Sequence, residues 1–228
     1  MSVHAGYAIH PHMVIGRIGR GGIATVYRAH DSLDGAEQVI YALAAVVEAK
    51  DPYIEAHTQR VADSGRRIGV RMGLPREDLA ALYQGGRIHD IGKIGVPDEI
   101  LLKPSPLDPV ETDRMHQHPV IGENIVAPLR TGAGLLSMIR HHHEHYDGSG
   151  YPDGLAGERI PLLARIVSVC DAYDAMTSDR PYRRGQSPEQ AMAVLRQGAG
   201  GQWDPQIVQL MVEELRRPID RVRRALAQ

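Results

Sequence analysis

From residue 36 onward, apolar residues recur at the three- and four-residue spacing of an amphipathic α-helix. Prolines, glycines and polar caps divide this stretch into separate helices. The clearest start is Ser187, where a capping serine precedes a proline and, three positions on, a glutamine. The pattern predicts helices over about 39–50, 57–72, 76–90, 111–126, 135–142 and 162–177, and two more that begin near 188 and 205.

Residues 1–35 carry another pattern. Two β-rich runs, 14–18 and 25–29, flank a glycine-rich turn, which predicts a β-hairpin. The segment IGRGGIATVYRAHD (18–31) resembles the first two strands of bacterial Ser/Thr protein kinases, whose glycine-rich loop covers nucleotide phosphates. However, residues 36–43 contain no lysine, and no H-R-D or D-F-G motif occurs in the chain, so we do not expect kinase activity. We interpret 1–35 as a relic or docking appendage.

Composition sets the expected fold class. Hydrophobic residues make up 43% of the chain, which is enough for a core. Phenylalanine is absent and aromatics reach only 4%, so the core must rely on Leu, Ile, Val, Ala and Met. No further strands are predicted. We therefore expect a mainly α protein in which a helical domain, 36–228, follows the small hairpin.

Charge, cysteine content and hydropathy argue against several classes of protein. The net charge is −2, and no general basic field argues for binding of duplex nucleic acid. The single cysteine, Cys170, excludes an intramolecular disulfide and indicates a small buried filler. No apolar stretch is long enough to span a bilayer, and the N-terminus lacks a signal-peptide pattern. We therefore expect a cytoplasmic protein without a membrane partner.

Most of the candidate metal ligands are histidines. Eight of the twelve lie between residues 57 and 145, together with aspartates. Neutral imidazole and carboxylate are common ligands of borderline metal ions, and two such ions held together can activate water against a phosphodiester. The adjacent His89 and Asp90 cannot share one helical face, but both can turn inward at a frayed helix end. With His57 and Asp171 on other helices, they would build one metal site.

Four long motifs resemble the HD-GYP family and occur in the family's order. They are HDIGKIGVPDEILLK (89–103), MHQHPVIGENIV (115–126), HHEHYDGSGYPDGLAGERIP (142–161) and RIVSVCDAYDAMTSDRPYR (165–183), and the resemblance covers about residues 36–216. HD-GYP proteins are metal-dependent phosphodiesterases of bacterial cyclic di-GMP, within the HD phosphohydrolase superfamily. The resemblance implies an HD-type helical bundle and a cyclic dinucleotide substrate. Because family members often form dimers, it also leaves a homodimer open.

Matched position by position, the resemblance implies a set of metal ligands and three substrate contacts. Asp90 is the expected bridge between two divalent ions, and mixed nitrogen and oxygen ligands suit iron or manganese. Lys93 is implied as a cation over the scissile phosphate, and Arg183 as the holder of the second phosphate. Tyr151 would either stack on a guanine or lock its loop by packing. The implied metal ligands are His57, His89, Asp90, His118, His142, His143 and Asp171, whereas His116, His141 and His145 flank them without matching.

The implied reaction is hydrolysis of cyclic di-GMP by a hydroxide that bridges the two metals, which gives the linear dinucleotide and, after a second cut, GMP. Two alternatives stay open. The substrate could be another cyclic dinucleotide or nucleotide, or the protein could be a cyclic di-GMP receptor or adaptor that has lost turnover. The presence of all the ligand positions and of Lys93 disfavours the receptor.

The number of bound ions is a testable outcome. Some family members place a glutamate four residues before the first histidine, where it helps to hold a third metal. Here that position is Tyr53, and Glu55 lies on a different helical face from it. We therefore expect two tightly bound ions per chain, which metal analysis of the purified protein by mass spectrometry checks. Three ions per chain would contradict this prediction.

Overall fold

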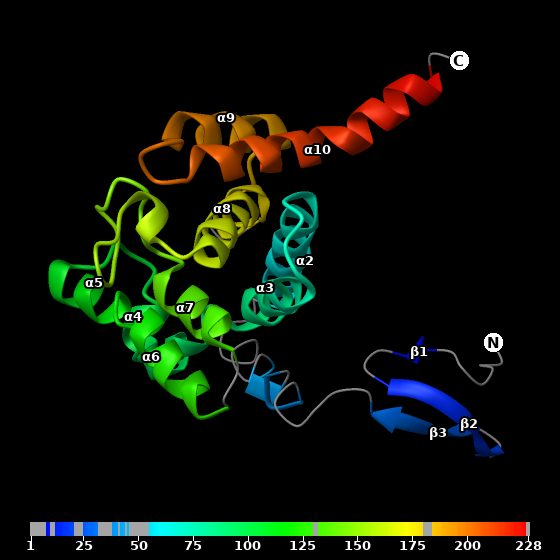
Figure 1. Ribbon diagram of the computed structural model, residues 1–228. Helices are drawn as coiled ribbons and strands as arrows, with labels where there is room; N and C mark the ends of the chain where they lie inside the picture. Colours follow the sequence, from blue (N-terminus) through cyan, green and yellow to red (C-terminus); the bar gives the residue numbers. More distant parts are fainter. Residues whose placement is uncertain are drawn as a thin grey trace. The chain divides into compact units, whose positions relative to one another are not determined.

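The computed structural model describes residues 8–9, 12–20, 25–31, 38–40, 42–43, 45, 55–129, 132–179 and 184–226 (Figure 1). The chain divides into two compact units, Met1–Ala42 and Leu43–Gln228. The described residues of the first unit form three antiparallel strands in the order β1-β2-β3. β2 pairs with β3 from His12 opposite Asp31 to Arg20 opposite Thr25. The strands are β1 (Ala8–Ile9), β2 (His12–Arg20) and β3 (Thr25–Asp31).

The second unit is built from helices and turns, which confirms the prediction of a mainly α protein. Among the described helices, none combines the length and the apolar composition that a bilayer span requires. The α-helices are α2 (Glu55–Arg71), α3 (Arg76–Ile88), α4 (Asp98–Leu101), α5 (Pro109–Met115), α6 (His118–Val126), α7 (Ala133–His141), α8 (Leu162–Thr177), α9 (Pro188–Gly198) and α10 (Pro205–Leu226). The described connections between them include the 3-10 turns η1 (Ile91–Gly95), η2 (Ala127–Leu129) and η3 (Gly157–Arg159).

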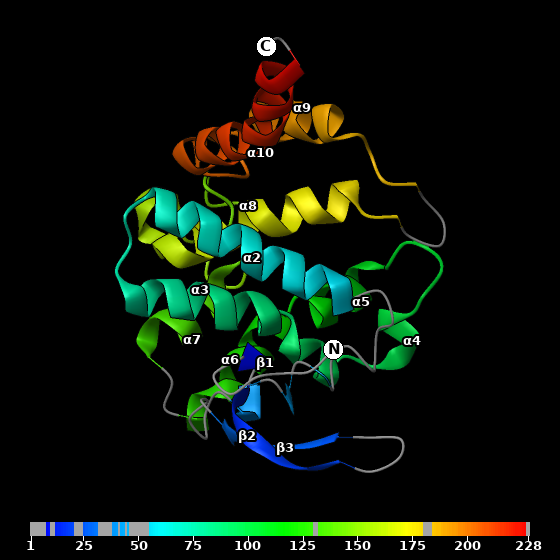
Figure 2. The same cartoon turned by 90° about the vertical axis from the view of Figure 1, so that its right-hand side faces the viewer.

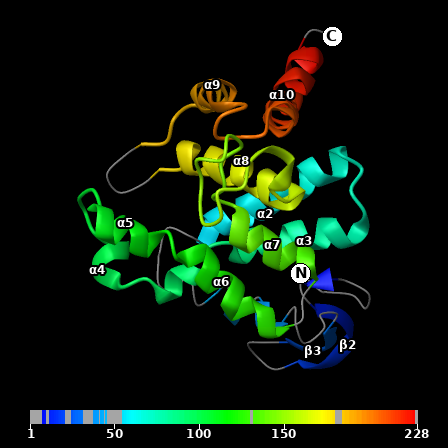
Figure 3. The same ribbon diagram turned by 60° about the vertical axis from the view of Figure 1, so that its left-hand side comes forward.

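The helices of this unit pack in layers around α2 and α8. Figure 2 shows these two helices between the α9–α10 pair on one side and α3 and α7 on the other. α6 packs on α7, next to which it lies in Figure 3. It also packs on η1. As the composition predicts, the core between the layers is aliphatic, and Cys170 is a buried filler within it. Fully buried core side chains include Val61, Ile68, Leu82, Met138, Ile139 and Ile166.

Local signals explain where the helices begin. Ser187 caps α9 through a reciprocal pair of hydrogen bonds with Gln190, as predicted. The expected single helix over 111–126 is wrong, because the structure has two helices, α5 and α6, separated by a turn at His116–Gln117. Pro119 has no N–H group and cannot continue a helix from α5, but it fits the first turn of α6. The break leaves the buried His118 at the start of α6.

Gly86 sets the distance between α2 and α3. A Cβ at this position would lie 2.6 Å from Cα and 2.8 Å from N of Ala62, which are backbone atoms that cannot give way unless the helices separate. We expect Gly86→Ala to lower the free energy of unfolding by about 1–3 kcal/mol in urea titrations, because overpacking strains the core.

Gly65→Ala, on α2, is the matched control. The nearest atom to a Cβ there is Cδ2 of Leu82 at 3.7 Å, an ordinary contact. Because alanine is the better helix former, the free energy of unfolding should stay unchanged or rise by up to about 1 kcal/mol. Equal losses in the two variants would show that Gly86 has no special role.

Candidate metal centre

Three of the predicted ligand histidines lie at helix ends. His89 follows α3, His118 begins α6 and His142 follows α7. In each, Nδ1 lies next to the carbonyl oxygen three residues earlier, at 3.0, 2.8 and 2.7 Å respectively. Because a carbonyl can only accept, Nδ1 carries the proton and Nε2 keeps its lone pair in all three rings. The last carbonyls of a helix lack partners within it, so one bond both satisfies the helix end and orients the ring.

The opposite sides of these rings are buried and lack partners. Within the part of the chain that the structure describes, Nε2 of His89, His118 and His142 has no hydrogen-bond partner, and neither has Oδ1 of Asp90. A buried polar group without a partner destabilises a fold by about 1–3 kcal/mol. Four such atoms in one place are therefore suited to donate their lone pairs to one bound group. A metal cation fits this donor set.

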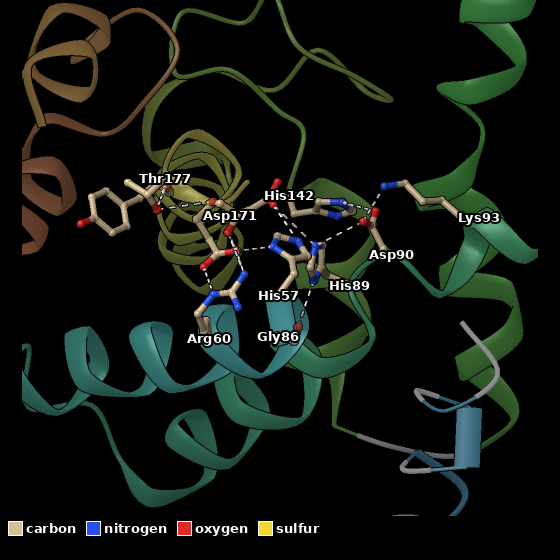
Figure 4. A network of polar contacts seen from close by, with 12 residues as sticks. His57, Arg60, Gly86, His89, Asp90, Lys93, His142, Asp171 and Thr177 are labelled. Atoms are coloured by element: carbon tan, nitrogen blue, oxygen red, sulfur yellow. Dashed lines mark hydrogen bonds and ion pairs between the residues drawn. The ribbon is translucent and has the colours of Figure 1, made fainter. Parts of the chain in front are cut away.

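Asp90 lies at the centre of the set. Its Oδ1 is 3.3 Å from His118 Nε2 and 3.9 Å from His142 Nε2, while its Oδ2 is 3.5 Å from His89 Nε2. The ammonium of Lys93 lies 2.6 Å from Oδ2. Figure 4 shows this ion pair between the two side chains. Burial opposes the charge of Asp90, but Lys93 and His89 hold the pKa of its carboxyl well below its usual value. An ionised carboxylate therefore faces the imidazoles.

A second pair of donors comes from α2 and α8 (Figure 4). His57 Nε2 lies 3.2 Å from Oδ1 of Asp171, which is 3.9 Å from His89 Nε2. Burial opposes protonation of His57, but hydrogen bonds with Asp171 and Asp174 raise its pKa to about 9. Burial lowers the pKa of His89 to about 4 despite the nearby Asp90. A cation would therefore compete with a proton at His57 but not at His89.

The ligand atoms form two groups that share Asp90, and within each group they lie within 4.8 Å of one another. A carboxylate has two oxygens, so Asp90 can serve both groups. Burial lowers the pKa values of His118 and His143, which favours the neutral imidazole that binds metals. Asp171 adds a carboxylate beside the second group. The cluster could hold divalent metal ions. The two groups are Asp90, His118, His142 and His143, and His57, His89 and Asp90.

The structure describes the positions of two of the three predicted substrate-contacting residues. Lys93 lies beside the cluster in its carboxylate ion pair. The ring of Tyr151 stacks on His116, with centroids 3.8 Å apart, and on His143, with centroids 4.9 Å apart. His116, which matches no ligand position, thus contacts the loop instead. Arg183 lies outside the described residues.

The sequence interpretation missed two residues beside His57. Asp174 accepts a hydrogen bond from Nδ1 of His57 at 2.7 Å and another from Arg60 Nη2 at 2.8 Å. A signal for both was present in the sequence. Asp174 follows Asp171 by three positions and Arg60 follows His57 by three, so each lies on the same helical face as a predicted ligand.

Glu144 is a third residue that the sequence interpretation left without a role. Its buried carboxylate accepts hydrogen bonds from the backbone N–H groups of Asp153 at 2.7 Å and Leu155 at 3.0 Å. Gly150 packs closely against it, because a Cβ there would lie 2.6 Å from Cα of Glu144. The glycine-rich segment 148–154 is therefore folded back onto Glu144 and bonded to it.

We expect Glu144→Ala to release this loop. Two backbone N–H groups would lose their acceptor, so the free energy of unfolding should fall by about 1–3 kcal/mol. Hydrogen exchange at the amides of Asp153 and Leu155 should become faster. Glu158→Ala, which removes an exposed carboxylate from the same region, is the control and should change neither measurement. Unchanged exchange in Glu144→Ala would contradict this role.

Known proteins resemble the chain across this domain. The sequence profile of the HD domain family matches residues 42–207. The cyclic di-GMP phosphodiesterase response regulator RpfG of Xanthomonas campestris pv. campestris is 39% identical over 173 residues, which are 75% of this chain and 46% of that protein. The 3′3′-cGAMP-specific phosphodiesterase 3 of Vibrio cholerae is 35% identical, over 78% of this chain and 39% of that protein. The chain thus spans less than half the length of these curated relatives.

The fold has solved counterparts as well. A crystal structure of a cyclic GMP-AMP-specific phosphodiesterase of Vibrio cholerae superposes with a TM-score of 0.63 at 18% identity, covering 80% of this chain and 49% of that one. At this identity the likeness shows the helical fold. The HD-GYP resemblance of the motifs is consistent with these relatives. The matched profile covers most of the chain, and the chain belongs to the HD domain family.

Proposed function

We propose that residues 36–228 form a phosphodiesterase domain that hydrolyses cyclic di-GMP with the help of two divalent metal ions. The observation that carries this proposal is the set of buried donor atoms around Asp90 that have no hydrogen-bond partner among the described residues. Packing alone does not account for them, whereas cations would satisfy all of them. The cyclic di-GMP phosphodiesterase of Xanthomonas campestris, at 39% identity, supports the substrate class.

The residues of the cluster fit a pair of cations. Their mixed nitrogen and oxygen donors suit iron or manganese. When bound, the two cations would polarise the phosphate and lower the pKa of the attacking water. The protein's part is to hold neutral imidazoles and ionised carboxylates in place, with one oxygen of Asp90 for each group. The proposed ligands are His57, His89, Asp90, His118, His142, His143 and Asp171.

Three residues are proposed on the substrate side. Lys93 would offset the negative charge that develops on the phosphate oxygens, and its ion pair with Asp90 already holds the ammonium beside the cluster. Arg183 would hold the second phosphate, because its guanidinium suits bidentate contacts. Tyr151 already stacks on His116 and His143, which supports a role in locking the loop over a role in stacking on a guanine.

3′3′-cGAMP is a second candidate substrate. The relative from Vibrio cholerae that is named for this dinucleotide is 35% identical to the chain, close to the 39% of the cyclic di-GMP relative. Both substrates are cyclic dinucleotides with two phosphodiester bonds, so the same cluster could act on either. A receptor without turnover is disfavoured, because the donor atoms that catalysis needs converge in one place.

We further propose that residues 1–35 form a hairpin appendage outside the phosphodiesterase domain. The antiparallel pairing of β2 with β3 supports the hairpin, and the division of the chain at Ala42 supports its separation. The homodimer stays a prediction from the family resemblance. The cytoplasmic location stays a prediction from the composition.

The proposal is tested by incubating metal-loaded protein with cyclic di-GMP and, in parallel, with 3′3′-cGAMP, while products are followed by chromatography. We expect the linear dinucleotide, GMP or both from cyclic di-GMP. Asp90→Ala removes the carboxylate that the two groups share. Loss of a residue that only supports a metal ligand lowers activity by up to about 100-fold, so loss of this shared ligand should lower turnover by at least that factor.

Asp113→Ala, which changes an exposed carboxylate on α5, is the control and should keep full turnover. Faster turnover of 3′3′-cGAMP would favour the second substrate. Tight binding of cyclic di-GMP without product would favour the receptor. If neither dinucleotide is bound or cut, the proposed substrate class is wrong.

A further inference from the structure

His57 differs from the other imidazoles of the cluster in what orients it. His89, His118 and His142 donate their Nδ1–H to backbone carbonyls, which no side-chain substitution can remove. The Nδ1–H of His57 is donated to a carboxylate, Oδ2 of Asp174, at 2.7 Å. The orientation of His57 therefore depends on a second side chain.

Asp174 is itself held by several donors. Arg60 bonds to both carboxylate oxygens, through Nε to Oδ1 and through Nη2 to Oδ2 at 2.8 Å. The hydroxyl of Ser178 donates to Oδ2 at 3.1 Å and accepts from Arg60 Nη2 at 2.7 Å. The side chain of Asp174 is only 8% exposed. With donors on both oxygens and little free space, this carboxylate cannot turn away from His57.

The arrangement follows from two facing helices. His57 and Arg60 lie one turn apart on α2, and Asp171 and Asp174 lie one turn apart on α8, against which α2 packs. His57 thus reaches both carboxylates, with Nε2 towards Asp171 and Nδ1 towards Asp174. Figure 4 shows Arg60 on the side of His57 that faces away from Asp90. Arg60 and Asp174 belong to neither donor group, and Asp174 is connected to one of them by its hydrogen bond with His57.

A purely structural ion pair in the same domain provides a comparison. Asp204 is 3% exposed and pairs with Arg165 Nη1 at 2.5 Å. Its other oxygen accepts from the backbone N–H of Gln206 at 2.8 Å, at the start of α10. Asp204 therefore joins α8 to α10, and in the described part of the chain no hydrogen bond or ion pair links it to the donor groups. Asp174 also joins two helices, but one of its bonds goes to a proposed ligand.

We propose that Asp174, held by Arg60 and Ser178, positions His57 and thereby sets the affinity of one of the two cation sites, the one formed by His57, His89 and Asp90. A carboxylate that accepts the Nδ1–H of a ligand histidine fixes the tautomer and the ring orientation and makes Nε2 a better donor. Among the described residues, no hydrogen bond or ion pair joins Asp174 to the other site, which is formed by Asp90, His118, His142 and His143. This inference rests on the proposed metal-dependent function.

The test is a titration of the metal-free full-length protein with Mn²⁺, in which the free ion is followed by electron paramagnetic resonance. The wild-type protein should bind two ions. Asp174→Asn keeps the volume but loses the charge, so one of the two sites should bind Mn²⁺ about 10- to 100-fold more weakly while the other keeps its affinity. Arg60→Gln, at a side chain that is 47% exposed, should weaken the same site to a smaller extent.

Asp204→Asn is the matched control, because it removes a buried, arginine-paired carboxylate away from the donor groups. It should bind two ions with wild-type affinity. Circular dichroism and thermal unfolding will show that each variant is folded at the temperature of the titration. A selective loss at one site in Asp174→Asn, absent from Asp204→Asn, supports the positioning role.

Wild-type affinity at both sites in Asp174→Asn would overturn the inference. Equal weakening of both sites, or the same loss in Asp204→Asn, would also overturn it, because the effect would then be a general loss of structure. A wild-type protein that binds no Mn²⁺ would instead overturn the proposed metal site, and the inference with it.

Discussion

The candidate metal centre depends on one repeated interaction, the hydrogen bond from a buried imidazole to the carbonyl three residues earlier. It makes Nδ1 the protonated nitrogen of His89, His118 and His142, so that the lone pair of each Nε2 points to the interior. The bond needs a carbonyl at or near the end of a helix. The ends of α3, α5 and α7 must therefore meet at one place, and the turn between α5 and α6 serves this requirement.

This arrangement concentrates polar groups where a helical domain would normally bury apolar ones. Orphaned ring nitrogens destabilise the fold, and two carboxylates, Asp90 and Asp171, lie among them. Lys93 offsets the charge of Asp90, and His57 offsets that of Asp171. Such partners make the cluster tolerable without a ligand, while the unpartnered lone pairs leave it able to bind cations. The same atoms therefore lower the stability of the fold and provide its capacity to bind cations.

The glycine-rich loop beside the cluster is held by hydrogen bonds to a buried carboxylate and by ring stacking. Glu144 accepts from two of its backbone N–H groups, and Tyr151 stacks on the imidazoles of His116 and His143. Since His143 also belongs to one of the donor groups, the loop and the proposed metal site share a residue. The loop that contains Tyr151 therefore lies directly beside the proposed metal site.

The sequence by itself determined the helical fold, because helical periodicity is a local property, and the resemblance of its motifs to a known family implied the set of candidate ligands. It also located the capped start of α9. It misjudged the run over 111–126, where Pro119 and the turn before it override the apolar pattern. Only the tertiary structure decided that Asp174 contacts His57 and that Glu144 accepts from the loop, since their partners lie on another helix or across a turn. Spacing along a chain shows which side chains share a face, whereas the packing of helices decides what that face meets.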